Sequence, residues 1–411
     1  MCRAARVLFA AVLLTAPGIV AQDLPEASPD AIAAHVEGLR AYLAGDNLGA
    51  LPHFYRAHEI DPTFYVPVLM AAVSTLNAVA AGNAGMTAVN DSLWDVVAEN
   101  RFRFSDYYQR RIDVNLLRRE GRNEEALELA REAAAAYPGT KIVYNYSLYS
   151  LQDGRPKAAL EALATLDPDR EPMKNWISFF SNWCNAAHFA GDFSQEERCG
   201  RTGSARFPAN GFADWHVAVA RASEGRLADV DGPLEEAMSH ENAVGGWIGN
   251  IGTTLWAHGY GEAAAKPYLE KAVAWYQALP PDQAQRPAMR RQGAYWLYAS
   301  GRYDEARSAY EGIVADLGSV ADRGYFGITS ALAGDRATAA GILDEFMGGD
   351  MDLTAPQRHY WAGLLCAAMG DRDRAAEHLS QTWSGTWDHH EPVLIPLRDD
   401  PVIKVFLAPR G

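Results

Sequence analysis

The chain has 411 residues, of which 48% are hydrophobic and 22% are charged, with a formal net charge of −15. An acidic protein repels phosphate backbones, so this charge argues against nucleic acid as a partner. The length exceeds that of an ordinary single domain, but a repeat array avoids that limit because each unit needs contact only with its neighbours. Four cysteines are too few to define the fold by disulfides.

Residues 1–21 are predicted to form a secretory signal peptide. Arg3 and Arg6 precede an unbroken apolar run, Val7 to Leu14, and small residues up to Ala21 follow it. The run is far shorter than the roughly 20 residues that span a bilayer. We therefore expect export to the periplasm or the extracellular space, with an uncleaved anchor as the alternative. Cleavage after Ala21 would remove Arg3 and Arg6 and so change the formal net charge from −15 to −17.

Glycines recur through the chain at a nearly constant spacing. From Gly121 onward the intervals are 33, 37, 34, 34, 42, 33 and 36 residues, and Gly82 divides the longer interval that precedes them. The positions are Gly45, Gly121, Gly154, Gly191, Gly225, Gly259, Gly301, Gly334 and Gly370. A glycine ends a helix cheaply in a left-handed turn, so the spacing predicts helical hairpins.

Small residues and prolines follow these glycines at fixed offsets. Alanine lies five and twelve residues after the glycine, and proline lies seventeen after it. The matches are Ala50, Ala57 and Pro62, then Ala126, Ala133 and Pro138, with the first alanine repeated at Ala159, Ala264, Ala306, Ala339 and Ala375 and the proline at Pro208. The alanines allow the second helix of each hairpin to lie close to its neighbours, and the proline ends it.

Together these patterns resemble the tetratricopeptide repeat family over roughly residues 32–383. The chain also resembles, more narrowly, the repeat region C-terminal to effector domains in bacterial transcriptional regulators and protein kinases. The segments that carry this likeness are residues 53–57 (HFYRA), 104–111 (FSDYYQRR) and 396–401 (PLRDDP). Here a signal peptide stands in place of an effector domain, so no DNA-binding or kinase role is carried over.

The resemblance implies an all-α, right-handed solenoid of nine or ten antiparallel hairpins. We place a flexible leader at 22–30, the repeat array at 31–387 and a C-terminal capping segment at 388–411, with an inserted loop at 279–282. Such arrays need an atypical end to cover the last apolar edge. The alanine pattern lapses in two repeats. Glu196 and Gly203 stand at the two alanine positions after Gly191, and Val230 stands at the first alanine position after Gly225.

First-helix residues line the concave groove in this family, which points to candidate partner-binding residues. Arg111, Asn115 and Asn145 match the offsets at which some members grip a peptide's terminal carboxylate. Ser178 and Asn182 stand where further basic residues would complete that clamp, so ordinary groove residues are the alternative. Aromatic side chains at groove-facing offsets are Trp215, Trp256, Tyr295 and Tyr298.

Cysteine and histidine positions give two further hypotheses. Cys184 and Cys199 flank Gly191 at matching heights of one hairpin, so they form either a disulfide or a pair of small packing residues. Residues 388–391 (DHHE) hold metal-binding residue types, but adjacent residues lack chelating spacing, and a polar loop is the favoured interpretation. His188, His216 and His258 are interpreted as packing residues. No catalytic residue, cofactor or metal site is therefore predicted.

These observations favour a non-catalytic exported scaffold that binds a protein or peptide in its groove. The alternative is a helical repeat module that senses a small molecule and relays its presence to a partner. A metal-dependent enzyme using residues 388–391 is the least favoured hypothesis, because no base or nucleophile accompanies the cluster.

Overall fold

The computed structural model describes residues 27–80, 84–170, 173–348, 353–382 and 388–410. The predicted signal peptide and most of the predicted leader lie outside these residues, as does Gly82. Within them the chain is helical and contains no strand, which confirms the predicted all-α class. No helix in this part of the chain combines the length and apolar character needed to cross a membrane.

The chain divides into two compact units. The first comprises residues 27–150 and 158–182, and the second comprises 151–157 and 183–410. The helices up to the boundary are α2 (Pro29–Leu43), α3 (Asn47–Ile60), α4 (Val66–Ala80), α5 (Thr87–Glu99), α6 (Asp106–Arg119), α7 (Asn123–Ala136), α8 (Lys141–Gln152), α9 (Pro156–Ala164) and α10 (Ile177–Phe189). The boundary passes through α8, α9 and α10.

The second unit continues with paired helices up to a tail of short elements. They are α11 (Phe193–Arg206), α12 (Phe212–Ser223), α13 (Asp231–Met238), α14 (Gly245–Ala257), α15 (Glu262–Gln277), α16 (Pro281–Ala284), α17 (Pro287–Ala299), α18 (Tyr303–Asp316), α19 (Val320–Leu332), α20 (Arg336–Gly348), α21 (Ala355–Ala368) and α22 (Arg372–Leu379). The tail holds the 3₁₀ helices η5 (Asp388–His390) and η6 (Ile395–Leu397) and the helix α23 (Pro401–Leu407).

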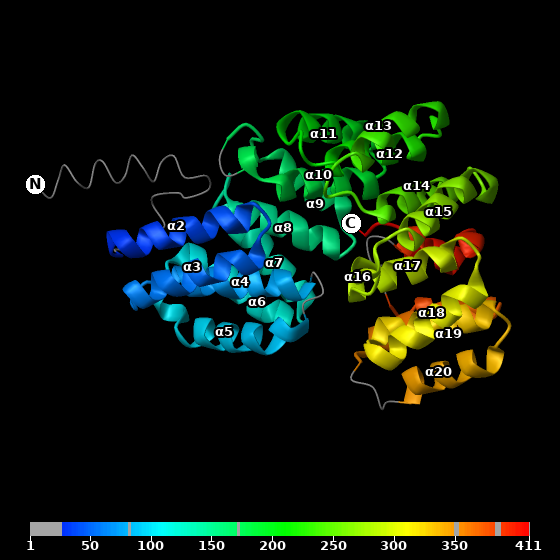
Figure 1. The fold of residues 1–411 in the computed structure, drawn as a ribbon. Helices are drawn as coiled ribbons and strands as arrows, with labels where there is room; N and C mark the ends of the chain where they lie inside the picture. Colours follow the sequence, from blue (N-terminus) through cyan, green and yellow to red (C-terminus); the bar gives the residue numbers. More distant parts are fainter. Residues whose placement is uncertain (1–26, 81–83, 171–172, 349–352, 383–387, 411) are drawn as a thin grey trace, which may run out of the picture. The chain divides into compact units, whose positions relative to one another are not determined.

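Each of the nine predicted turn glycines ends a helix in the left-handed conformation, with φ between 72° and 93°. At seven of these turns the flanking helices pack against each other, as α14 and α15 do in Figure 1. Five residues after the glycine, the alanine is fully buried in six of the seven predicted cases: Ala50, Ala126, Ala159, Ala306, Ala339 and Ala375. The hairpin prediction is therefore confirmed at the level of individual turns.

The seventh alanine differs because its turn is one residue longer. Gly259 and Gly261 both have positive φ, and α15 begins only at Glu262. The buried packing position consequently moves from Ala264 to Ala265, which is fully buried. The predicted loop at 279–282 also differs, since Pro281 starts the one-turn helix α16. Proline suits a helix start because its fixed φ is helical and its missing N–H is not needed there.

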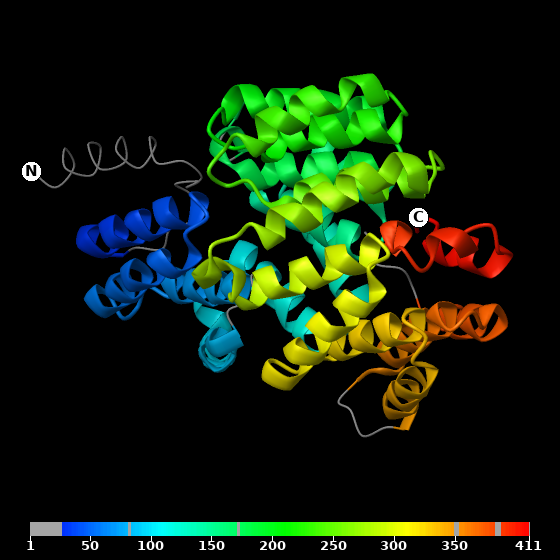
Figure 2. The same cartoon turned by 45° about the vertical axis from the view of Figure 1, so that its right-hand side comes forward.

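Local contacts explain where the first described helix begins and how the C-terminal tail packs. Helix α2 begins at Pro29, inside the segment predicted as leader, because the Ser28 hydroxyl caps it by accepting from the Ala31 N–H. At the other end, Ile403 and Phe406 of α23 are buried in one apolar cluster with Trp361 and Leu365 of α21, and α23 lies beside α22 (Figure 2). The tail thus covers the apolar edge of the last hairpin.

Candidate binding groove

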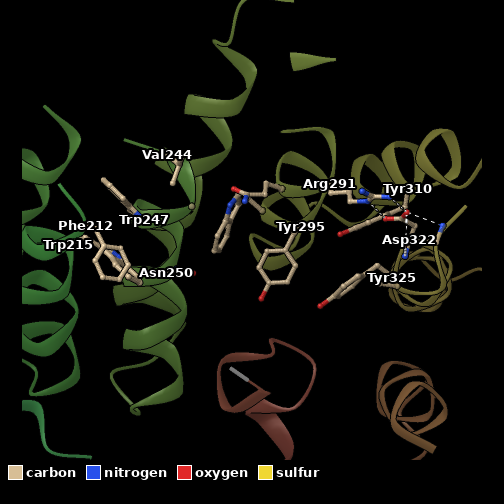
Figure 3. A pocket seen from close by; sticks show the side chains of 15 residues that line it. Phe212, Trp215, Val244, Trp247, Asn250, Arg291, Tyr295, Tyr310, Asp322 and Tyr325 are labelled. Atoms are coloured by element: carbon tan, nitrogen blue, oxygen red, sulfur yellow. Dashed lines mark hydrogen bonds and ion pairs between the residues drawn. The ribbon is translucent and has the colours of Figure 1, made fainter. Parts of the chain in front are cut away.

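A cavity of about 480 Å³ lies in the second unit, where α12, α14, α17 and α19 face one space (Figure 3). These are the first helices of successive hairpins, so the cavity crosses the repeats. Its lining consists of Phe212, Trp215, Val244, Gly246, Trp247, Asn250, Arg291, Gln292, Tyr295, Trp296, Tyr310, Ser319, Ala321, Asp322 and Tyr325. We call this cavity the aromatic groove, because nearly half of these side chains are aromatic.

Ring contacts fix the walls of the aromatic groove. At one end Trp215 stacks on Trp247, with ring centroids 6.2 Å apart and planes 14° apart. Tyr295 stands between the two ends (Figure 3) and meets the ring of Tyr325 edge-on at 5.7 Å. Tyr325 in turn stacks on Tyr310 at 5.5 Å. Such mutually packed rings offer a large apolar surface that loses little rotamer freedom when a ligand binds.

An ion pair closes the far end of the aromatic groove. Arg291 donates from Nε and Nη2 to the two carboxylate oxygens of Asp322, both at 2.8 Å. Asp322 also accepts from the Ser319 hydroxyl at 2.6 Å, as part of the capping box that starts α19. Partial burial acts to raise the pKa of Asp322, but the bonds from Arg291 and Ser319 outweigh it and lower that pKa. The carboxylate therefore stays ionised and holds Arg291 in place.

Glycines in α14 allow side chains of α17 to pack closely against the backbone of α14 in the groove wall. A Cβ atom at Gly249 would lie 2.5 Å from the ring of Trp296, nearer than real atoms approach. The Gly246 N–H donates to the Tyr276 hydroxyl at 3.1 Å, and that hydroxyl donates to Gln292 in the groove lining. Close backbone approach thus sets the position of Trp296 and of Gln292.

The structure places the predicted groove residues of the second unit in different environments. Trp215 and Tyr295 line the aromatic groove. Tyr298, in contrast, is 1% exposed and hydrogen-bonds to Glu391 at 2.5 Å and to the Val393 N–H at 3.1 Å. Its predicted place on an open surface is wrong, because the C-terminal tail covers it. Trp256 packs beside the apolar cluster formed by α15 and α17 and does not line the groove.

The predicted clamp residues lie in the first unit. Arg111 is 7% exposed and its guanidinium lies 5.6 Å and 5.7 Å from the ring centres of Tyr108 and Tyr107. Asn115 uses its amide within the fold, donating to the Arg111 carbonyl at 2.8 Å and accepting from Tyr149 at 3.3 Å. Asn145 occupies the adjacent helix α8, half-buried.

A second cation, which the sequence analysis did not single out, accompanies Arg111. The Lys141 ammonium lies 4.6 Å from the ring centres of both Tyr42 and Trp176 and donates to the Tyr42 hydroxyl at 3.2 Å. Burial is the main reason that the pKa of Lys141 is lowered, with Arg111 adding to it. Within the described residues neither cation forms an ion pair, which gives this region a local excess of positive charge.

Cys184 and Cys199 form a disulfide with Cα atoms 5.6 Å apart, joining α10 to α11. Beside it, Glu196 occupies the buried position that alanine holds in other hairpins, 0% exposed. His188 and His216 donate from Nδ1 to its two oxygens, at 3.0 Å and 2.7 Å. The two histidines are buried as predicted, but they serve a polar network rather than apolar packing.

Sequence patterns did not predict several residues of the groove. Arg291, Asp322 and Tyr325 carry no distinctive motif, although residues 319–322 (SVAD) form a capping signature that marks the start of α19. The lapse at Glu196 was visible in the sequence as a carboxylate in place of a packing alanine. A charged residue at a regularly buried position is the signal that could have directed attention there.

No family model matches this sequence, and no curated protein matches it. Among solved structures, a tetratricopeptide repeat protein from Parabacteroides merdae is 14% identical over 64% of this chain and 96% of its own, with a TM-score of 0.36. PilF of Pseudomonas aeruginosa is 15% identical over 57% of this chain and 97% of its own, at 0.31. Yeast Tom70 is 10% identical over 92% and 91%, at 0.40.

The repeat type follows from the chain's own geometry, to which these low similarities add no argument. Nine left-handed glycine turns recur in the described residues, a buried alanine lies five or six residues beyond seven of them, and the flanking helices pack against each other at seven. The described residues therefore form an all-α array of helical hairpins with the turn and packing pattern expected of tetratricopeptide repeats.

Proposed function

We propose that this protein is an exported, non-catalytic scaffold whose aromatic groove binds an extended segment of a partner protein. The observation that carries the proposal is the groove itself, lined by the first helices of successive hairpins over about 480 Å³. A site that crosses repeats suits a chain running along the array, since each hairpin supplies its own contacts. Aromatic anchors commonly supply much of the binding energy at such sites.

The polar groups of the groove indicate what the partner segment presents. Asn250 and Gln292 offer amide donors and acceptors that pair with an extended peptide backbone. Arg291 is held by Asp322 at one end, and this ion pair favours a polar side chain there. Apolar side chains of the partner would rest on the rings of Trp247 and Tyr295.

A competition between peptides and small molecules tests this proposal. Ala321 is exposed and lines the groove, so Ala321→Trp fills the site without disturbing the core. We expect fluorescence polarisation with a library of labelled peptides to yield binders, and Ala321→Trp to weaken them at least tenfold. Ala340→Trp, at an exposed alanine of α20, is the matched control and should bind unchanged. Equal binding by both variants contradicts the assignment.

The alternative, a small-molecule sensor, is favoured by the volume of the groove. About 480 Å³ falls in the usual range for metabolite pockets. If the sensor hypothesis holds, thermal-shift screening will show stabilisation by a metabolite that Ala321→Trp abolishes, while no peptide binds. That outcome replaces the scaffold proposal.

Export is part of the proposal and has a separate test. The Cys184–Cys199 disulfide supports it, because such bonds persist mainly in oxidising compartments. In a bacterial host, the full sequence should yield protein in the envelope or medium fraction with Gln22 as its first residue. Retention in the cytoplasm with residues 1–21 attached contradicts export.

A further inference from the structure

Four histidines from three distant segments meet in the second unit. His188 comes from the end of α10, His258 caps the C-terminus of α14, and His389 and His390 belong to η5 in the tail. One ring nitrogen from each lies within 4.8 Å of the others. From the sequence, residues 388–391 are interpreted as a polar loop because adjacent residues lack chelating spacing; folding brings His188 and His258 to that place.

We propose that His188, His258, His389 and His390 bind a divalent transition-metal ion, Zn²⁺, which fastens the C-terminal tail to α10 and α14. Four protein ligands are the usual number for a structural zinc site. Imidazole nitrogen suits Zn²⁺ and its neighbours in the transition series, whereas Mg²⁺ and Ca²⁺ prefer oxygen. In a tetrahedral site with Zn–N bonds of about 2.1 Å, the ligand nitrogens lie roughly 3.4 Å apart, so small side-chain rotations complete the geometry.

Glu196 provides the orienting contact that metal-binding histidines normally have. Its carboxylate accepts from Nδ1 of His188 at 3.0 Å, which places the lone pair of that ring on Nε2. A carboxylate behind a ligand histidine fixes the ring and strengthens it as a donor. Glu196 is fully buried where other hairpins have alanine, and the Cys184–Cys199 disulfide holds its helix against α10. Glu196, which interrupts the alanine pattern, thus orients a ligand of the proposed site.

His258 supplies an independent observation. Its Nε2 atom is buried and has no hydrogen-bond partner in the described part of the chain. A buried polar atom without a partner costs free energy that a ligand would recover.

A cavity lies beside three of the four rings. A cavity of about 180 Å³ is bordered by His188, His258 and His389 together with Phe189 and Phe193. Leu407 and Pro409 of the tail complete its wall. The apolar rings around the cavity lower the local dielectric, which strengthens the bond between a cation and its ligands. An ion that enters there meets donors from three segments of the fold.

Metal titration of the full chain tests the proposal. After treatment with a chelator, isothermal calorimetry with Zn²⁺ should show one ion per chain, and Co²⁺ should give the absorption bands of a tetrahedral nitrogen site. His258→Ala should weaken Zn²⁺ binding at least 100-fold, and Glu196→Gln 10–100-fold because it acts through His188. Zn²⁺ should raise the Tm of the intact chain but not of His258→Ala.

Control variants keep the test decisive. His53→Ala, at an exposed histidine of α3, should leave binding unchanged. Should His258→Ala fail to fold, His389→Ala in the tail segment replaces it, with circular dichroism to verify folding. The proposal is overturned if Zn²⁺ does not bind stoichiometrically, or if a folded ligand variant loses less than tenfold in affinity.

Discussion

Single small residues decide how closely neighbouring repeats approach. A Cβ atom at Gly324 in α19 would lie 2.2 Å from the ring of Trp361 in α21, and the ring could not shift within its packed cluster. The sequence revealed the turn glycines and the alanines beyond them, because these recur at fixed offsets. Gly324 follows no such offset, since its role depends on one tryptophan in the next hairpin.

Gly324→Ala should therefore destabilise the protein although alanine is the better helix former. We expect a loss of about 1–3 kcal/mol, as in other overpacked cores. Gly341→Ala in α20 is the matched control, since an added Cβ there meets nothing within 4 Å. That control should gain about 0.5–1 kcal/mol from helix propensity alone. Urea unfolding measures both, and a stabilised Gly324→Ala would contradict this account of the contact.

At the scale of helices, an arginine cluster joins α11 to α12. Glu197 accepts from Arg201 at 2.7 Å on its own helix, from Arg221 at 3.1 Å on α12, and from Arg226 in the turn beyond. Partial burial acts to raise the pKa of Glu197, but these hydrogen bonds outweigh it and lower that pKa to about 2. No sequence pattern predicts this arginine cluster, because its members come from different elements.

The depressed pKa gives a definite dependence of stability on pH. The unfolded chain takes up a proton on Glu197 near pH 4.5, whereas the folded chain resists until about pH 2. The stabilisation is therefore complete above about pH 5 and is lost as the pH falls towards 2. Glu197→Gln should be less stable than the parent at pH 7, with the difference shrinking on acidification. Denaturant titrations at pH 7, 5, 4 and 3 measure it, with the exposed Glu241→Gln as control.

On the scale of the whole molecule, the sequence predicted the architecture better than the sites. Repeat geometry is local, so turn glycines and packing alanines predict it in most of the hairpins. The sites depend on contacts between distant segments, as when Glu391 of the tail accepts from Tyr298 at 2.5 Å and Tyr325 at 3.1 Å. The predicted capping segment therefore covers Tyr298, which repeat offsets alone had placed in an open groove.

In a repeat array each hairpin is stabilised mainly by its neighbours. A destabilising change in the second unit should therefore leave the first unit unaffected. Phe406 of α23 is 6% exposed against Trp361 and Leu365, whereas its neighbour Val405 is 75% exposed. Phe406→Ala should cost about 3–5 kcal/mol and speed amide hydrogen exchange in α19 to α22. Exchange in α2 to α6 of the first unit should stay unchanged, and Val405→Ala should alter neither region. If exchange instead rises equally in both units, the array unfolds as one cooperative body, and the tail stabilises the whole chain rather than the hairpins it covers.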